Sequence, residues 1–174
     1  STGRLVFTHS GSLAFTIPIS GPGSMTKLGA GTTTLSVDSS YSGGTTVHAG
    51  TLEVTNANGL GLGSGPAIVS PTALAQIRFS GSASAGAIAI TSRRSASAAI
   101  ASSVIFLDSA TATTAAITIE RATPEREIPG YLAFNGSTRG GTAQITNGGG
   151  TSTGLTFGGG SMDFFATSSA ESAT

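Results

Sequence analysis

Hydrophobic residues recur along the whole chain in short runs of four to eight residues, which polar turn residues separate. Runs such as AIAIT and AAITI alternate apolar and polar positions with a period of two, which is typical of β-strands. Gly, Ser, Asn or Pro bounds most runs. Only the Ala-rich residues 83–116 offer a helical alternative, and Ser and Thr at nearly every other position there favour strands. The pattern predicts an all-β chain without significant helix.

A longer period is superimposed on this pattern in the second half of the chain. Phe79, Phe106 and Phe134 follow one another at almost equal spacings. Each is followed by Ser at +3, a small residue at +4 and Ile at +11, and a further copy is expected to begin at Phe165, with Ser168 at +3. The repeated positions are Ser82, Ser109 and Ser137, then Ala83, Ala110 and Thr138, then Ile90, Ile117 and Ile145. A period in the twenties is typical of a β-solenoid.

We therefore predict a right-handed parallel β-helix of roughly six to eight coils, in which stacked coils pair their backbones and the repeated Phe and Ile form inward ladders. A β-sandwich is the structural alternative, but a sandwich does not need the same residue types at a fixed long period. We expect residues 1–174 to be a single β-helix fragment of a larger protein, with Phe-x-x-Ser repeats over residues 79–174.

Composition excludes several classes of partner. The 8 basic and 8 acidic residues give zero net charge, which provides no electrostatic basis for binding nucleic acid. The sequence lacks an apolar run of about 18 residues, so we expect no membrane insertion by this segment. Without cysteine, disulfides and thiolate metal sites are excluded.

Candidate catalytic or metal-binding groups are sparse. His9 and His48 lie in strand-like runs, and neither has a second ligand at metal spacing. Asp38, Asp108 and Asp163 stand far apart and alone. We expect no metal, no cofactor and no catalytic residue.

One segment departs from the repeat. Residues 120–130, ERATPEREIPG, hold two prolines, which block ladder hydrogen bonds, so we expect a charged loop that protrudes from the solenoid. A solvated loop that tolerates insertion is the simpler interpretation, and a ligand contact loop is the functional one. Its candidate contact residues are Glu120, Arg121, Glu125, Arg126 and Glu127.

Residues 21–63 hold an ordered series of turn glycines and strand residues. The series is Lys27, Gly29, Gly31, Thr32, Leu35, Tyr41, Gly43, Gly44, Thr45, Thr46, Val47, Gly50, Thr51, Leu52 and Val54. This series resembles the passenger-associated transport repeat, also called the autotransporter-associated β-strand repeat. The chain departs from that pattern at Met25, Thr33 and Val37, and the turn glycines are intact. Within the motif we expect Val47 to point inward, His48 outward, and the Tyr41 ring to pack with its hydroxyl in water.

This resemblance implies a passenger domain of a bacterial autotransporter or adhesin. The chain is then expected to be a non-catalytic structural or adhesive stalk, secreted or held at the cell surface through an outer-membrane anchor in a missing C-terminal region. Its expected partner is a host-surface, glycan or matrix ligand. Two alternatives stay open: a subunit that stacks head to tail into an extracellular filament through open β-helix ends, and a fragment of a β-helix polysaccharide lyase or hydrolase.

Overall fold

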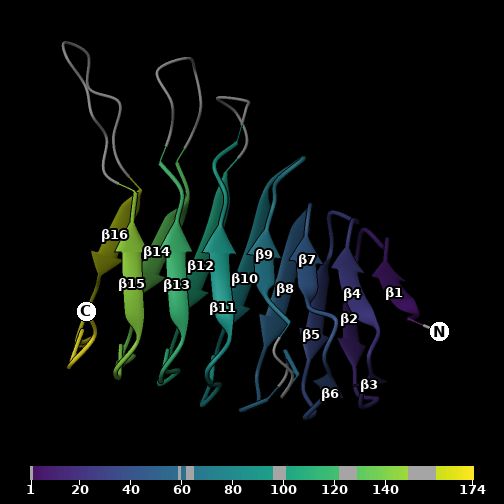
Figure 1. Cartoon of the computed structure of the whole chain (residues 1–174), viewed down its shortest axis with the longest axis horizontal. Helices are drawn as coiled ribbons and strands as arrows, with labels where there is room; N and C mark the ends of the chain where they lie inside the picture. Colours follow the sequence, from purple (N-terminus) through teal and green to yellow (C-terminus); the bar gives the residue numbers. More distant parts are fainter. Residues whose placement is uncertain (1, 59, 62–64, 96–100, 122–128, 149–159) are drawn as a thin grey trace.

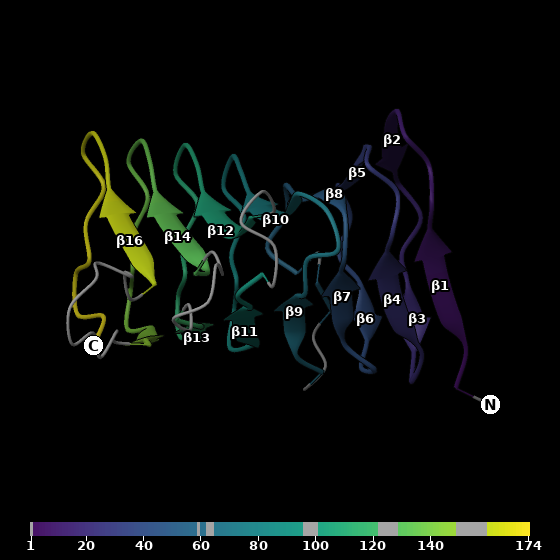
Figure 2. The ribbon, with the colours of Figure 1, turned by 90° about the horizontal axis from the view of Figure 1, so that it is seen from above.

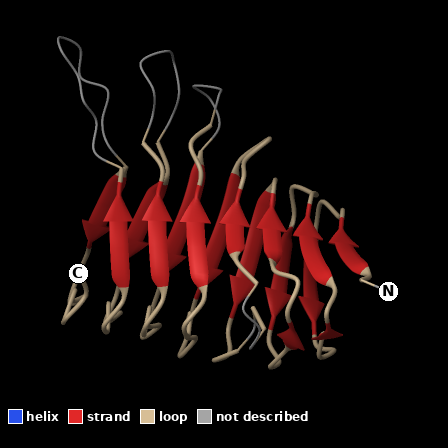
Figure 3. Ribbon diagram, viewed as in Figure 1, coloured by secondary structure: helices blue, strands red, loops and turns tan. Residues whose placement is uncertain are grey.

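The chain folds into a parallel β-helix. The computed structural model describes residues 2–58, 60–61, 65–95, 101–121, 129–148 and 160–174. These residues form sixteen short strands and no helix (Figure 3). Two long sheets run side by side along the molecule, and every strand pair in them is parallel (Figures 1 and 2). The predicted fold class is confirmed, whereas the handedness and the number of coils stay predictions.

The strands are divided among three sheets, in each of which spatial neighbours are one coil apart along the chain. Sheet A contains β1 (Arg4–Phe7), β4 (Ser24–Lys27), β7 (Thr45–Val47), β9 (Ala67–Val69), β11 (Ala89–Ser92), β13 (Ala116–Ile119) and β15 (Gln144–Asn147). Sheet B contains β2 (Ser12–Phe15), β5 (Thr32–Leu35), β8 (Gly50–Val54), β10 (Ala75–Phe79), β12 (Ser102–Phe106), β14 (Tyr131–Phe134) and β16 (Ser161–Phe164). Sheet C contains β3 (Ser20–Gly21) and β6 (Ser40–Tyr41).

The coils lengthen along the chain. In sheet B, Ser12 pairs with Thr32, so the first coil runs from one of these residues to the other. Near the C-terminus Tyr131 pairs with Ser161, and this coil is half as long again. We call residues 4–54 the short-coil region and residues 75–174 the long-coil region. The extra residues do not enter the strands, which keep two to five residues throughout, so they lengthen the connections between strands.

The core of the long-coil region consists of stacked identical side chains. The rings of Phe79, Phe106, Phe134 and Phe164 lie almost parallel, with centroids 4.8, 4.9 and 4.9 Å apart and interplanar angles of 5° to 7°. Across the core, sheet A aligns the three isoleucines of the repeat in the same way. The predicted inward ladders are therefore confirmed. Each coil covers the apolar face of its neighbour, because no coil alone has enough apolar surface to form a core. The aligned isoleucines are Ile90, Ile117 and Ile145.

The prediction that the last copy of the repeat begins at Phe165 is wrong. Phe164 pairs with Phe134 and stacks on its ring, although at the end of the ladder it is still 37% exposed, and Phe165 is 46% exposed. Consequently Thr167, not Ser168, stands at the +3 position, and its hydroxyl donates to the Gly136 carbonyl at 3.0 Å. The sequence offers two adjacent phenylalanines, and the hydrogen-bond register selects the one that faces the core.

Two turn positions with an unusual backbone conformation recur at the same place in every long coil. At +2 and +7 from each stacked Phe the backbone has positive φ, a region that glycine adopts without steric cost. Glycine and non-glycine residues alternate there from one coil to the next, and the carbonyls of Asp108 and Thr113 approach the glycines above them closely. Gly81, Asp108, Gly136 and Ala166 stand at +2, and Gly86, Thr113, Gly141 and Glu171 stand at +7.

Candidate functional site at the loop edge

The connections that lead from a strand of sheet A to the next strand of sheet B form one edge of the solenoid, which we call the loop edge (Figure 1). Its connections begin in register: the Arg93 N–H donates to the Val69 carbonyl, and the Glu120 N–H donates to the Ser92 carbonyl, both at 2.9 Å. The connection between β7 and β8 has only residues 48–49, and that between β13 and β14 has residues 120–130. Most of the coil lengthening therefore occurs at this edge.

Glu120 lies beside two arginines of the preceding coil. Its Oε1 is 3.8 Å from Arg93 Nε, and its Oε2 accepts a hydrogen bond from the Arg94 backbone N–H at 3.4 Å. The two side chains of the ion pair are 33% and 48% exposed. Solvent weakens such a pair to at most about 1 kcal/mol, so its importance is the charge that it brings to the loop edge rather than its contribution to stability.

The predicted contact loop is closed at its base. The Gly130 N–H donates to the Glu120 carbonyl at 2.9 Å, so the two ends of this segment lie side by side. Gly130 is needed there because a Cβ would approach the Ser92 carbonyl oxygen to 2.3 Å. Of the predicted contact residues, Glu120 and Arg121 are placed by the structure at this base, and Glu125, Arg126 and Glu127 lie outside the described residues. The contact role of the loop stays a prediction.

Sequence reasoning missed Arg93 and Arg94 as neighbours of the charged loop. The signal was present, because Arg93 precedes Glu120 by the same spacing as separates Phe79 from Phe106. In a solenoid with that period, residues one repeat apart become direct neighbours. The repeat thus identifies neighbours in the loops as well as in the core.

The histidines make local contacts. His48 Nδ1 lies 2.9 Å from the Ser70 carbonyl, and His9 Nε2 lies 2.8 Å from Thr33 Oγ1. Val47 is buried and His48 half-buried, as the alternation predicts. In the part of the chain that the structure describes, no group of three or more His, Cys, Asp or Glu side chains is arranged to hold a metal ion. Those residues also contain no helix that is long and apolar enough to cross a membrane.

Lys27 of the transport-repeat-like segment is buried in the core. Its register neighbours on either side in sheet A are Phe7 and Val47, and its relative exposure is 0%. The ammonium group donates to the carbonyl oxygen of Gly29 and, at 3.5 Å, to that of Ala49. Burial lowers the pKa of Lys27 because the charged form loses hydration. The lysine thus ties together the backbone turns of two successive coils.

Tyr41 is also buried, which corrects the prediction that its hydroxyl lies in water. The side chain is 2% exposed, and its hydroxyl forms a hydrogen bond with Thr45 Oγ1. Burial raises the pKa of Tyr41 to about 12, although the hydrogen bond with Thr45 acts in the opposite direction. The side chain fills a corner of the short coil between sheets C and A, where it has no room to reach solvent.

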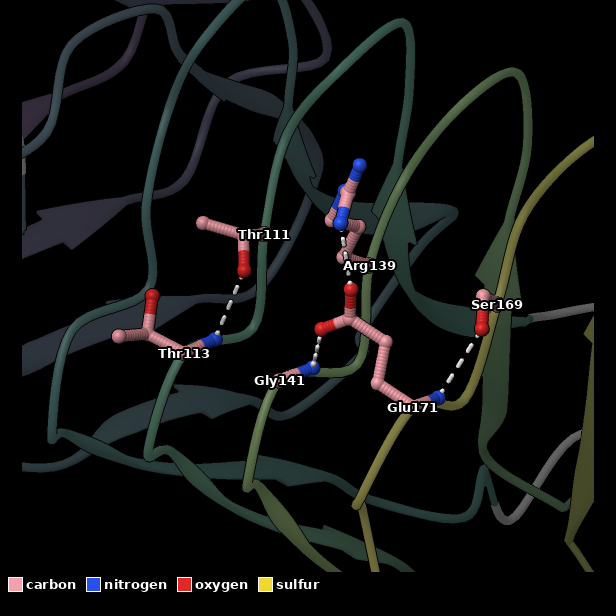
Figure 4. A network of polar contacts seen from close by, with 6 residues as sticks. All are labelled: Thr111, Thr113, Arg139, Gly141, Ser169 and Glu171. Atoms are coloured by element: carbon pink, nitrogen blue, oxygen red, sulfur yellow. Dashed lines mark hydrogen bonds and ion pairs between the residues drawn. The ribbon is translucent and has the colours of Figure 1, made fainter.

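A polar ladder follows the turns on the opposite edge of the long-coil region (Figure 4). In one coil Thr111 Oγ1 accepts from the Thr113 N–H, and in another Ser169 Oγ accepts from the Glu171 N–H, each at 3.1 Å. Arg139 occupies the equivalent position of the intervening coil and has no hydroxyl to offer. There the Gly141 N–H donates instead to Glu171 Oε2 at 3.1 Å, while Glu171 Oε1 pairs with Arg139 Nη1 at 2.8 Å. Glu171 therefore replaces the missing turn acceptor.

Comparison with known proteins identifies one segment. Residues 25–54 match the family model described as Passenger-associated-transport-repeat. The match spans β4 to β8 and includes the buried Lys27 and Tyr41, so the resemblance seen in the sequence is confirmed. No curated protein sequence and no solved structure matched the chain.

Proposed function

We propose that this chain is a non-catalytic stalk segment of the passenger domain of an autotransporter-type bacterial surface protein, secreted and displayed outside the cell. The transport repeat at residues 25–54 is the observation that carries the proposal. The continuous parallel β-helix supports it, because stacked coils make a stiff elongated body whose loops are free to contact ligands. The loop edge, with its charged connections, is the surface proposed for adhesion.

Surface display tests this proposal. The chain would be placed between a secretion signal and the C-terminal β-barrel of an autotransporter, and protease accessibility would be measured on intact cells. We expect a large accessible fraction, and a chain retained inside the cell would overturn the proposal. In Gly50→Ala we expect a strong loss of display, because Gly50 has φ +70° and a Cβ would meet the Gly29 and Gly31 carbonyl oxygens at 2.4 Å. Gly86→Ala, at φ +65° in open space, is the matched control.

The filament alternative is the weaker one on geometry. In a head-to-tail filament, the last long coil of one molecule, between Tyr131 and Ser161, would stack on the first short coil of the next molecule, between Ser12 and Thr32. Because the two coils differ in length, their turns would not align. Light scattering of the purified chain tests it, since the mean size of a filament must increase with protein concentration.

The lyase or hydrolase alternative is tested by incubation with pectin-like polysaccharide. If products are released, and if Glu125→Ala or Glu127→Ala abolishes their release, the enzyme alternative replaces the stalk proposal.

A further inference from the structure

Three Asn-Gly pairs occur in the chain, at residues 58–59, 135–136 and 147–148. Such a pair can modify itself, because glycine has no side chain to keep its backbone nitrogen away from the amide carbon of the preceding asparagine. A hydrogen bond to either group holds it in place and opposes the reaction. Gly59 lies outside the described residues, so the comparison is between the second and third pairs.

The Asn135 side chain is exposed and has no hydrogen-bond partner among the described residues. It follows directly after β14, in a turn on the edge opposite the loop edge. Leu107 and Phe165 occupy the same position in the two neighbouring coils, because the N–H of each of the three residues donates to the stacked Phe of the coil before it. Neither apolar side chain can hold the Asn135 amide by a hydrogen bond.

The Gly136 N–H also lacks an acceptor in the part of the chain that the structure describes, and the stacking explains why. In an earlier coil Gly81 occupies the same turn position, and its N–H donates at 2.9 Å to the Oδ2 of Asp108 in the next coil. The residue that follows Gly136 in this column of turn positions is Ala166, which has no side-chain acceptor. Gly136 therefore has a free backbone nitrogen next to a free asparagine amide.

The third pair has the same two residues, but both of its reacting groups are held. Asn147 ends β15, and its Nδ2 donates to the Gly160 carbonyl at 2.6 Å. The Gly148 N–H donates to the Ile119 carbonyl at 2.9 Å. Both hydrogen bonds must break before the Gly148 nitrogen can reach the amide carbon of Asn147. The chain thus contains its own protected reference for Asn135.

We propose that Asn135 is a self-modification site, at which asparagine becomes aspartate or isoaspartate without an enzyme. The Gly136 nitrogen attacks Asn135 Cγ, so that a C–N bond forms, the Cγ–Nδ2 bond breaks, and the side-chain nitrogen leaves as ammonia with the Gly136 amide proton. Water then opens the resulting five-membered imide. It supplies the new carboxylate oxygen, returns one proton to the Gly136 nitrogen and releases the other to solvent. Opening at Cγ gives aspartate, and opening at the backbone carbonyl gives isoaspartate.

The isoaspartate product loosens the stacking of the last coils. Its main chain is one carbon longer between residues 135 and 136. In the unmodified chain the Asn135 N–H donates to the Phe106 carbonyl at 2.9 Å, and the Ser137 N–H donates to the Asp108 carbonyl at 2.7 Å. These two bonds fix a span of three residues on the coil before it, and a longer main chain cannot keep both. The stability of the C-terminal coils should therefore decrease with time after folding.

The test measures amide loss at Asn135 and Asn147 in one sample of the folded protein. The purified chain is incubated at mildly alkaline pH, and mass spectrometry of proteolytic peptides follows the conversion of each asparagine. We expect Asn135 to react about 10-fold faster than Asn147, because two hydrogen bonds must break first at Asn147. In isolated peptides of the same two sequences, which lack the contacts between coils, the two rates should be similar.

A substitution in the following coil tests the role of the free Gly136 N–H. In Ala166→Asp, the new carboxylate stands to Gly136 as Asp108 stands to the glycine of the earlier coil. It should hold the N–H and slow the reaction of Asn135 about 3-fold. Ala166→Gly is the matched control, because it adds no acceptor and glycine suits the positive φ of this residue. It should leave the rate unchanged.

Several outcomes would overturn the proposal. These are an intact Asn135 amide after incubation, equal rates at Asn135 and Asn147 in the folded chain, or equal rates in Ala166→Asp and Ala166→Gly. Thermal unfolding shows that each fresh variant is folded. It should also show a loss of stability on incubation of the wild type but not of Asn135→Gln, and equal changes would contradict the loosening. The reaction needs only the chain and water, so its outcome is independent of the surface-display experiment.

Discussion

The short-coil and long-coil regions fill the same β-helix in two different ways. In the long-coil region, identical residues stack on one another, as in the ladder from Phe79 to Phe164. In the short-coil region, one inward file of sheet A contains Phe7, Lys27 and Val47, three chemically different side chains. The core there includes polar groups with dedicated partners, such as Tyr41 with Thr45.

This difference shows that in-register stacking is a property of the backbone and does not require repeated residues. Parallel hydrogen bonding aligns the coils in both regions. Where the sequence repeats, the side-chain ladders add dispersion and aromatic contacts. Where it does not, each buried polar group needs its own hydrogen bond, because an unpaired one costs about 1–3 kcal/mol. We therefore expect the stability of the short-coil region to depend more on pH, and that of the long-coil region to depend more on side-chain shape.

The largest expected effect is in the aromatic ladder. Phe106→Ala should lower the free energy of unfolding by about 3–5 kcal/mol, because it leaves a cavity and removes ring contacts on both sides. Urea denaturation measures the loss. Phe165→Ala is the control, since Phe165 is exposed beside the stacked Phe164, and it should cost less than about 1 kcal/mol. Equal losses in the two variants would mean that the register of the last coil is different.

Alkaline pH should destabilise the short-coil region, because the buried Tyr41 hydroxyl then ionises. The pKa of Tyr41 is about 12 when folded and near 10 when unfolded, so its stabilising contribution is complete below pH 10 and is lost as the pH rises toward 12. The loss amounts to roughly 2–3 kcal/mol. Denaturation of the wild type and Tyr41→Phe between pH 9.5 and pH 12 gives the difference, in which Lys27 and Tyr131 cancel because both proteins contain them. Parallel pH profiles would show that Tyr41 ionises freely.

Two glycines of the long-coil region have the same backbone conformation. Substituting each by alanine distinguishes the cost of a positive φ from the cost of a steric contact between coils. Gly86 and Gly141 both have φ +65°, but a Cβ at Gly141 would lie 2.5 Å from the Thr113 carbonyl, whereas Gly86 has open space. Gly86→Ala should cost about 1–2 kcal/mol from the left-handed conformation alone. Gly141→Ala should cost measurably more in thermal unfolding. If the two costs are equal, the contact between coils relaxes freely.

The smallest effect is expected at the polar ladder of Figure 4. Glu171→Ala should cost at most about 1 kcal/mol, because the ion pair with Arg139 and the Gly141 turn are exposed. Arg139→Ser should restore the hydroxyl acceptor that the neighbouring coils use, as in Ser169 with Glu171. In that background Glu171→Ala should cost less than in the wild type, and a double-mutant cycle measures the difference. Additive losses would show that Glu171 does not replace the turn acceptor.

Much of the fold could be predicted from local pattern. The two-residue alternation predicted the strands, and the spacing of Phe79, Phe106 and Phe134 predicted the neighbours in the core. The candidate site was predicted less well. Glu120 was identified by its charge, but its contact with Arg93 depends on stacking between coils.

By itself, the sequence determined that this chain is an all-β solenoid and that residues 25–54 match the transport-repeat family model. Both follow from local information: residue size, β-propensity and glycine placement repeat along the chain. Tertiary structure decided which of Phe164 and Phe165 faces the core, and that Lys27 and Tyr41 are buried. It also decided that Glu120 lies beside Arg93 of the preceding coil. These outcomes depend on the hydrogen-bond register between coils, which joins residues that lie a whole coil apart in the sequence.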